Sequence, residues 1–289
     1  MTSILGQVTS GGPQAGQRIV IAGQEKVGKT TLACGAPGAL LIPLETDPVA
    51  MARYAHTPQL TNWQQVKQLC EELRAGAMNG QIKRGSSLVW DSATALERII
   101  HNEVIMTDPK AAQAIKAGVA LSTITMEKVH EGYGKAYAAA NDFFATWMRY
   151  MDELATYGGI NIIVTCHVFP ARIVDPTSGE FDTWDLLLHS PRNNRTYGKR
   201  ELITQWADMI GFLHEPNFVM KAEKGETVQR AISANQGRQL AVSRTPAWVA
   251  GNRYGLNGVI PIPEQNGWQA LAMAIGNSTQ GRVDLRNSR

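Results

Sequence analysis

The first residues with evident chemistry lie in the stretch GQEKVGKTTL, where Gly23, Gly28, Lys29 and Thr30 have the spacing G-x-x-x-x-G-K-T. Glycines let the backbone wrap around phosphate oxygens, the lysine reaches the β- and γ-phosphates, and the hydroxyl coordinates Mg²⁺. We therefore predict a site for ATP and Mg²⁺ in preference to a glycine-rich turn with a solvated lysine. The predicted nucleotide-binding residues are Gly23, Gln24, Glu25, Lys26, Val27, Gly28, Lys29, Thr30 and Thr31.

A second metal ligand is expected at the end of another buried strand. The run LVWDS delivers Asp91 after three apolar residues. A carboxylate there can hold Mg²⁺ through water, so we predict Thr30 and Asp91 as the metal ligands. Asp91 could also cap the helix predicted to follow it, and the two roles are compatible.

The general base must come from elsewhere, because Asp91 is followed by Ser92 and not by a glutamate. Glu45 ends the run ALLIPLE, on the strand expected after the phosphate-loop helix. A carboxylate there can polarise water for attack on the γ-phosphate. The alternative is an acidic helix N-cap in ETDP, with Asp47 as the rival acid.

His167 ends the run IIVTCHV, at the same predicted edge of the sheet. A polar residue there can sense the γ-phosphate and relay its presence to the segment that follows. The plainer alternative is a histidine that only satisfies a local hydrogen bond.

The elements that position these residues are short apolar runs separated by helical patterns. Runs apolar on both faces begin at residues 18, 39, 86, 160 and 208, as in a buried parallel sheet. Amphipathic helices are predicted over 61–77 and 141–158. The alternation indicates an α/β fold with its ligand site at the carboxyl ends of the strands. Residues 169–188 predict a β-hairpin, and 107–132 predict helical pieces with a loop.

Composition indicates one large domain over 17–275, with flexible tails at 1–16 and 276–289. The net charge of +3 requires any nucleic-acid site to be a local patch. Three widely spaced cysteines favour reduced thiols in a cytoplasmic setting. Neither a signal peptide nor a membrane span is predicted.

Taken together, GQEKVGKTT, LIPLETD, SSLVWDSATAL and IIVTCH resemble the RecA-type ATPases, and more closely the phage-encoded RecA-like ATP-binding or single-strand annealing proteins. The resemblance spans roughly residues 17–265. It implies that Glu45 is the catalytic glutamate, that Asp91 and Ser92 end the Walker B strand, and that His167 occupies the sensor position.

RecA-like proteins also carry a basic-x-basic pair that reaches the γ-phosphate of a neighbouring subunit. The matching stretch AWVAGNRYG keeps Arg253 at the second position and has Gly251 at the first. The resemblance therefore implies that Arg253 acts in trans, with Arg244 as a compensating residue or with weak hydrolysis. The alternative for both is a surface arginine.

The resemblance further implies that residues 107–132 and 169–198 bind single-stranded DNA. The second segment mixes basic and aromatic residues, which suits backbone contacts and base stacking, although a solvated charged loop is the alternative. The predicted DNA-binding residues are Arg172, Arg192, Arg195, Lys199 and Arg200.

These inferences predict an ATPase that binds single-stranded DNA and promotes annealing or recombination in a phage-type system, in the cytoplasm of a bacterial host. The expected partners are single-stranded DNA, further copies of the chain in a filament or ring, and a single-strand-binding protein. A ring-forming helicase or helicase loader is one alternative. A nucleotide-gated assembly module with negligible turnover is the other.

Overall fold

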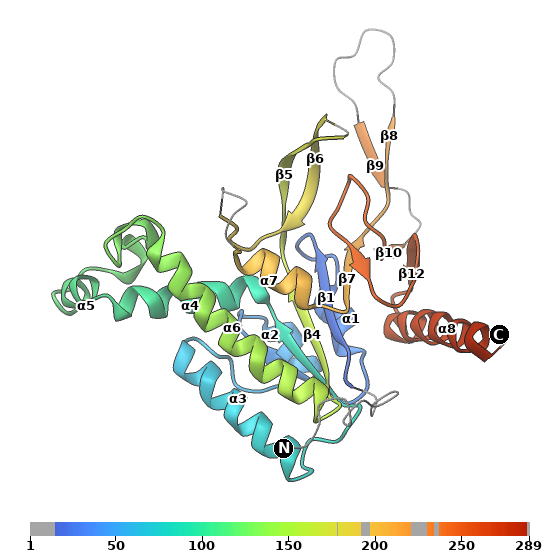
Figure 1. Cartoon of the computed structure of the whole chain (residues 1–289), viewed down its shortest axis with the longest axis horizontal. Coiled ribbons are helices and arrows are strands. Elements are labelled where there is room, and N and C mark those ends of the chain that lie inside the picture. Colours follow the sequence, from blue (N-terminus) through green and yellow to red (C-terminus); the bar gives the residue numbers. More distant parts are fainter. Residues whose placement is uncertain (1–14, 178, 192–196, 221–229, 234–236, 288–289) are drawn as a thin grey trace, which may run out of the picture.

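A central sheet of eight strands organises the chain (Figure 1). The computed structural model describes residues 15–287 except 178, 192–196, 221–229 and 234–236. The strands predicted from the apolar runs are confirmed, and they pair in parallel. In spatial order they are β2 (Ala39–Pro43), β3 (Ser87–Asp91), β4 (Asn161–Cys166), β1 (Arg18–Gly23) and β7 (Met209–His214).

Beyond β7 the sheet becomes antiparallel. β10 (Arg238–Ala241) pairs with β7, and β12 (Val259–Ile262) pairs with β10. The short β11 (Gly251–Asn252) also pairs with β7. Because β10 runs against β7, its first residue lies at the edge where the parallel strands end. The fold is thus mixed α/β with a mainly parallel sheet, as predicted.

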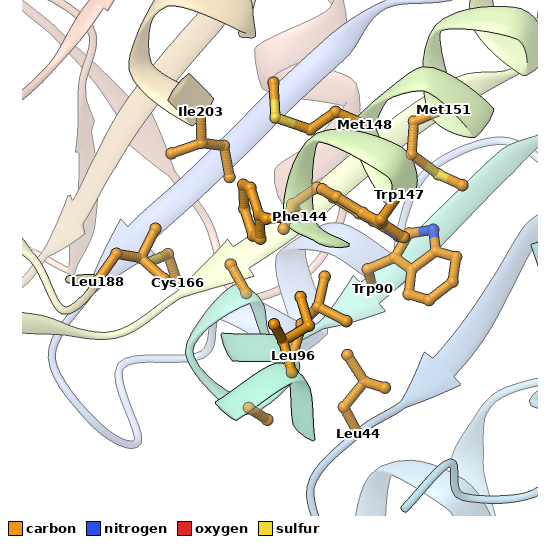
Figure 2. Packing of buried hydrophobic residues seen from close by; sticks show 14 of the residues in the cluster. Leu44, Trp90, Leu96, Phe144, Trp147, Met148, Met151, Cys166, Leu188 and Ile203 are labelled. Carbon is orange, nitrogen blue, oxygen red and sulfur yellow. The ribbon is translucent and has the colours of Figure 1, made fainter. Parts of the chain in front are cut away.

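Helices cover one face of the sheet with a core rich in aromatic residues. Trp90 of β3 and Trp147 of α6 meet edge to face, with ring centroids 5.5 Å apart (Figure 2). Phe144, also on α6, packs against Trp147. Asn62 caps the first of these helices by accepting a hydrogen bond from Gln65 N at 3.0 Å. The helices are α3 (Trp63–Met78), α4 (Ala93–Thr107), α6 (Lys135–Thr156) and α7 (Lys199–Trp206).

The opposite face carries α1 (Lys29–Cys34) and α8 (Gly267–Asn287). Side chains of a strand alternate between faces, so Ile19 and Ile21 pack here while Val20 packs under α6. Trp268 and Leu271 of α8 belong to the same apolar cluster. Where a flexible tail was expected over 276–289, α8 continues as a helix through residue 287, with buried residues in its first half; the flexibility of this end stays a prediction. Residues 1–14 of the expected N-terminal tail lie outside the described part of the chain.

Two β-hairpins stand away from the sheet and point towards the same end of the molecule (Figure 1). The predicted hairpin is β5 (Val168–Asp175) and β6 (Gly179–Leu186). The second, β8 (Asn217–Met220) with β9 (Arg230–Ser233), was not predicted. Backbone hydrogen bonds from Trp184 to Ala247 and from Val249 to Trp184 tie the first hairpin to the body. The hairpin β5–β6 therefore starts directly after His167, a predicted site residue, and is hydrogen-bonded to the body through Trp184.

The segment after α4 forms helical pieces, as predicted for 107–132. These are α5 (Pro109–Lys116) and the 3-10 turns η2 (Leu121–Thr123) and η3 (Met126–Lys128). The remaining helix, α2 (Pro48–Arg53), follows β2. Among the residues searched, none of the helices combines the length and the apolar character that a membrane crossing requires.

Candidate functional site

The loop between β1 and α1 has a backbone that only glycine fits at two positions. Gly28 has φ of +91°, in the left-handed region that side chains disfavour. A Cβ at Gly23 would lie 2.4 Å from the carbonyl oxygen of Leu213 on β7. Both glycines of the motif therefore have a structural reason, and the loop opens onto α1 as a phosphate-binding loop does.

Lys29 fills the centre of this loop. Its Nζ donates to the carbonyl oxygens of Gly23 at 3.0 Å and Gln24 at 2.7 Å, and the residue is buried. Burial lowers the pKa of Lys29, while Asp91 opposes that shift. A buried cation held only by carbonyl groups is ready to pair with a phosphate that enters the loop.

Thr30 and Asp91 are in direct contact at the ends of α1 and β3. Thr30 Oγ1 donates to Asp91 Oδ2 at 2.8 Å, and Thr165 Oγ1 donates to Asp91 Oδ1. Burial raises the pKa of Asp91, and the two threonine hydroxyls oppose the rise. A hydroxyl next to a carboxylate suits Mg²⁺, which takes few protein ligands and completes its shell with water and substrate phosphates. The two residues therefore fit the predicted metal.

The helices after Glu45 and Asp91 are capped by nearby residues, and not by these two acids. Ser92 accepts a hydrogen bond from Ala95 N at 3.2 Å and caps α4. Asp47 accepts from Ala50 N at 2.9 Å and caps α2. Asp91 and Glu45 are thus free of the capping roles considered for them, which leaves both carboxylates at the loop.

Glu45 is held by groups from two other strand ends. Ser92 Oγ donates to Glu45 Oε1 at 2.5 Å, and His167 Nε2 lies 3.2 Å from Oε1 and 3.3 Å from Oε2. Arg98 Nη2 lies 3.6 Å from Oε1. The hydrogen bond from His167 lowers the pKa of Glu45 to about 2, burial opposes the shift, and Ser92 and Arg98 add to it. Glu45 is therefore ionised at neutral pH and fixed in direction.

His167 connects this carboxylate with the hairpin. Its backbone N donates to Thr94 Oγ1 at 3.2 Å, and Thr94 Oγ1 donates to the carbonyl oxygen of Leu187 at 3.2 Å. Leu187 N in turn donates to the carbonyl oxygen of His167 at 2.8 Å. The end of β4, the start of α4 and the end of the hairpin thus form one hydrogen-bonded unit beside Glu45.

These predicted residues line one cavity of about 610 Å³. It is lined by Lys29, Thr30, Glu45, Asp91 and His167, which come from four segments of the chain, since Lys29 and Thr30 are adjacent. Two cations that the sequence did not single out, Arg53 and Arg98, line it as well. Arg98 lies near the start of α4, the helix that follows Asp91, and this place in the sequence was the only signal for it.

A smaller cavity of about 220 Å³ adjoins the first. Thr31 and Tyr54 line both cavities, so the two spaces meet at the first turn of α1. Trp268 and Pro263, after the antiparallel end of the sheet, line the smaller one. One space thus surrounds the acids and Lys29, and the other offers rings and apolar surface beside them.

Arg253 lies at the opposite edge of the sheet. Its Nη1 is 3.0 Å from Asp208 Oδ1 and its Nη2 donates to the carbonyl oxygen of Gln205 at 2.6 Å. Asp208 also pairs with Arg18, the first residue of β1, whereas the phosphate loop follows the last. Arg253 therefore does not reach the cavity of its own chain, and its role in trans stays a prediction.

Of the predicted DNA-binding residues, the three whose positions are described do not form one basic surface. Lys199 is fully buried, with its Nζ 3.4 Å from Glu97 Oε1, so its prediction as a DNA contact is wrong. Arg200 pairs with Asp185 and Glu201, and the exposed Arg172 pairs with Glu180 at 2.6 Å. The prediction for Arg192 and Arg195 falls outside the described residues. Acidic neighbours thus occupy the arginines whose positions are described.

Comparison with known proteins gives one match that covers most of the chain. The sequence model of a family described as AAA domain matches residues 15–254. This range contains the phosphate loop, Glu45, Asp91 and His167. No curated protein matches the sequence.

Proposed function

Because the chain belongs to the AAA domain family of P-loop ATPases, we propose that it binds ATP with Mg²⁺ in the cavity of Lys29, Glu45 and Asp91 and hydrolyses it. The observation that carries this proposal is the position of Glu45. It shares the cavity with the phosphate loop and is oriented by Ser92 and His167. A site that only bound phosphate would have no need of an ionised, oriented carboxylate in the same cavity as Thr30 and Asp91.

Each residue has a role that follows from its position. Lys29 leaves its carbonyl partners to bind phosphate oxygens, and Glu45 accepts a hydrogen bond from the attacking water and orients it. A pKa of about 2 makes Glu45 a weak base, so orientation outweighs proton removal in its contribution. Thr30 and Asp91 would hold Mg²⁺, which when bound neutralises charge on the phosphates.

We further propose that the bound γ-phosphate changes the contacts of His167 and thereby the segment after β4. The phosphate competes with Glu45 for the Nε2 hydrogen of His167. The backbone of His167 is joined to Thr94 and Leu187, so a shift of the ring reaches the base of the hairpin. These contacts support the RecA-like hypothesis, in which the state of the nucleotide controls a binding surface in the segment after β4.

Single-stranded DNA is the proposed ligand of that surface, and annealing or recombination in a phage-type system is the proposed outcome. Support comes from the resemblance and from the projection of both hairpins towards one end of the molecule (Figure 1). Arg172 on β5 and the two arginines outside the described residues, Arg192 and Arg195, remain the proposed backbone contacts. Lys199 is excluded by its burial.

A nucleotide-gated assembly module is the second candidate. Gly251 lacks the basic side chain that the resemblance implies, and Arg253 is engaged by Asp208. Without a cation from a neighbour, transition-state charge on the γ-phosphate receives less stabilisation and turnover is slow. Such a protein would bind ATP tightly and assemble, with hydrolysis too slow to matter.

The deciding experiment measures ATP binding and ATP turnover with and without an oligonucleotide. The full proposal requires turnover that single-stranded DNA stimulates and that Lys29→Ala abolishes. The matched control is Lys67→Ala, which removes an exposed lysine from α3 and should change nothing. Tight ATP binding without turnover supports the module, and stimulation confined to closed rings, seen by electron microscopy, supports a helicase or loader. Absence of ATP binding would refute the whole proposal.

A further inference from the structure

Arg238 lies directly against the phosphate loop of its own chain. It begins β10, and the next residue, Gln239, pairs with His214 at the end of β7. β7 is the neighbour of β1, so Arg238 lies at the edge where β1 ends in the loop. A Cβ added to Gly28 would lie 2.1 Å from Arg238 Nη1. The guanidinium therefore touches the glycine that precedes Lys29.

Acidic groups do not account for the position of this cation. Among the described residues no ion pair involves Arg238, and the hydrogen bond found there is a long one, from Nη2 to the Pro263 carbonyl oxygen at 3.4 Å. Glu264 lines the same small cavity without pairing with it. Arg238 is half-buried beside an anion-binding loop, and most of its N–H groups donate to none of the described residues. Such a guanidinium is suited to contact phosphate.

The position of Arg238 indicates which part of the nucleotide it meets. It lines the 220 Å³ cavity with Thr31 and Tyr54, and it is absent from the lining of the cavity that holds Glu45 and Asp91. Lys29 serves the phosphates on the side of the acids. The guanidinium touches Gly28 and shares a cavity with Thr31, away from the acids. A phosphate chain that begins at the acids and passes Lys29 would leave the loop near it.

We propose that Arg238 is a nucleotide-binding residue that acts in cis on the phosphate nearest the ribose. The assignment rests on the proposed ATP site. It differs in kind from a contact in trans, because a single chain suffices for it. Since ATP and ADP share this phosphate, Arg238 contributes equally to the binding of both.

The test is titration calorimetry with ADP and with a non-hydrolysable ATP analogue. For Arg238→Ala we expect the Kd of both ligands to rise by about ten- to a hundredfold, the effect of one charge-assisted hydrogen-bonding group. Arg238→Lys keeps the positive charge but cannot donate two parallel hydrogen bonds, so it should recover part of the lost affinity. Arg74→Ala, which removes an exposed arginine paired with Glu153, is the matched control and should bind like the unsubstituted protein.

Stability is measured in parallel by the melting temperature. The nucleotide-free variants should melt like the unsubstituted protein, and Arg238→Ala should lose the stabilisation that ADP gives it. If Arg238→Ala fails to fold, Arg238→Lys and Arg238→Gln carry the same test.

Two results overturn the assignment and leave the ATP site intact. One is unchanged affinity in the Arg238 variants while Lys29→Ala abolishes binding. The other is a loss for the ATP analogue alone, which would place Arg238 at the γ-phosphate. If the unsubstituted protein binds neither ligand, the proposed function itself fails, and the assignment fails with it.

Discussion

Glu45 gains its importance from the groups that hold it. His167 and Ser92 both donate to its carboxylate, and Arg98 approaches it from α4. Three donors around one acid fix its direction better than a free side chain could, at the expense of basicity. A fixed carboxylate of low pKa is suited to orienting water in a reaction whose main barrier is charge on phosphate oxygens.

Replacing this carboxylate should separate binding from hydrolysis. Glu45→Gln keeps the shape and the contact with Ser92 but removes the charge, so ATP affinity should stay close to that of the unsubstituted protein. The turnover rate should fall by a factor on the order of 10²–10⁴, the usual contribution of a positioned acid–base group. Calorimetry and a phosphate-release assay give the two quantities. Glu153→Gln, which removes a half-buried carboxylate paired with Arg74 near the end of α6, is the control. Turnover in Glu45→Gln equal to that of the unsubstituted protein would exclude the proposed role.

Acidification provides a second test at the level of single residues. Burial, with Lys199 and His189 nearby, lowers the pKa of His101 to about 3 from the usual value near 6.5. The unfolded chain therefore takes up a proton below pH 6.5 that the folded chain refuses until about pH 3. Stability from this group is complete above pH 6.5 and declines as the pH falls through that window.

The expected size of this decline is about 1.4 kcal/mol per pH unit, or about 2 kcal/mol between pH 6.5 and pH 5. Urea unfolding at pH 7 and pH 5 measures it. His101→Gln should lose less stability over this interval than the unsubstituted protein, with a remainder from His189, whose pKa burial also lowers. Identical losses in the two proteins would contradict the assignment to His101.

At the scale of elements, a buried ion pair joins α4 to α7. Glu97 Oε1 is 3.4 Å from Lys199 Nζ and accepts a hydrogen bond from His189 N at 2.8 Å. Burial lowers the pKa of Lys199, while Glu97 opposes that shift. The carboxylate of Glu97 thus contacts both His189 and Lys199, at the two ends of one segment. Glu97 itself lies five residues after Ser92, the cap of α4 that donates to Glu45.

Removing one partner of this pair should cost far more than removing both. Glu97→Ala leaves the Lys199 ammonium buried and unpaired, and we expect a loss of about 3–5 kcal/mol in the free energy of unfolding. Glu97→Ala combined with Lys199→Met should recover most of this loss, because no unpaired charge then stays buried. Urea unfolding of the single and double variants forms the cycle. Arg172→Ala breaks an exposed pair and should cost less than about 1 kcal/mol, and additive losses at the buried pair would refute the coupling.

The limits of sequence reasoning follow from the same elements. Lys29, Glu45, Asp91 and His167 could be predicted because carboxyl ends of parallel strands converge on one edge. Arg238 could not, since its place depends on an antiparallel strand whose pairing has no local signal. Lys199 was misjudged because a basic run looks the same whether its lysine meets water or a distant glutamate.

Two elements show the difference between pattern and context. The hairpin β5–β6 has alternating strands around a turn sequence, so it was predictable. The helix α8 continues into a polar, glycine-containing stretch that reads as a tail, and its first half is fixed by Trp268 and Leu271. Burial of one half of a helix can extend it beyond what local composition indicates.

At the scale of the whole molecule, the predicted role of Arg253 in trans depends on where this residue lies relative to the site. Arg253 lies at the sheet edge opposite the phosphate loop, beside Asp208 and Arg18, so it does not reach the site of its own chain, and its action on a neighbour's nucleotide stays a prediction. Gly251 lies on β11, two residues before Arg253, and a Cβ there would meet nothing within 4 Å. Gly251→Lys is therefore sterically tolerated, and it should raise turnover in assembled protein if this edge faces a neighbour's γ-phosphate.

Mixing two inactive variants tests the arrangement directly. Glu45→Gln protomers keep Arg253 but lack the Glu45 carboxylate. Arg253→Ala protomers keep that carboxylate but lack the arginine predicted to act in trans. If Arg253 acts in trans, interfaces that pair the first variant's arginine with the second variant's Glu45 are complete, and about a quarter of the interfaces in an equal, random mixture should be active. Turnover is compared for each variant alone and for the mixture, with Arg74→Ala in place of Arg253→Ala as the reference. A mixture no more active than the sum of its parts, while the unsubstituted protein hydrolyses ATP, would show that each chain completes its own site, with Arg98 as the nearest cation to Glu45 for that task.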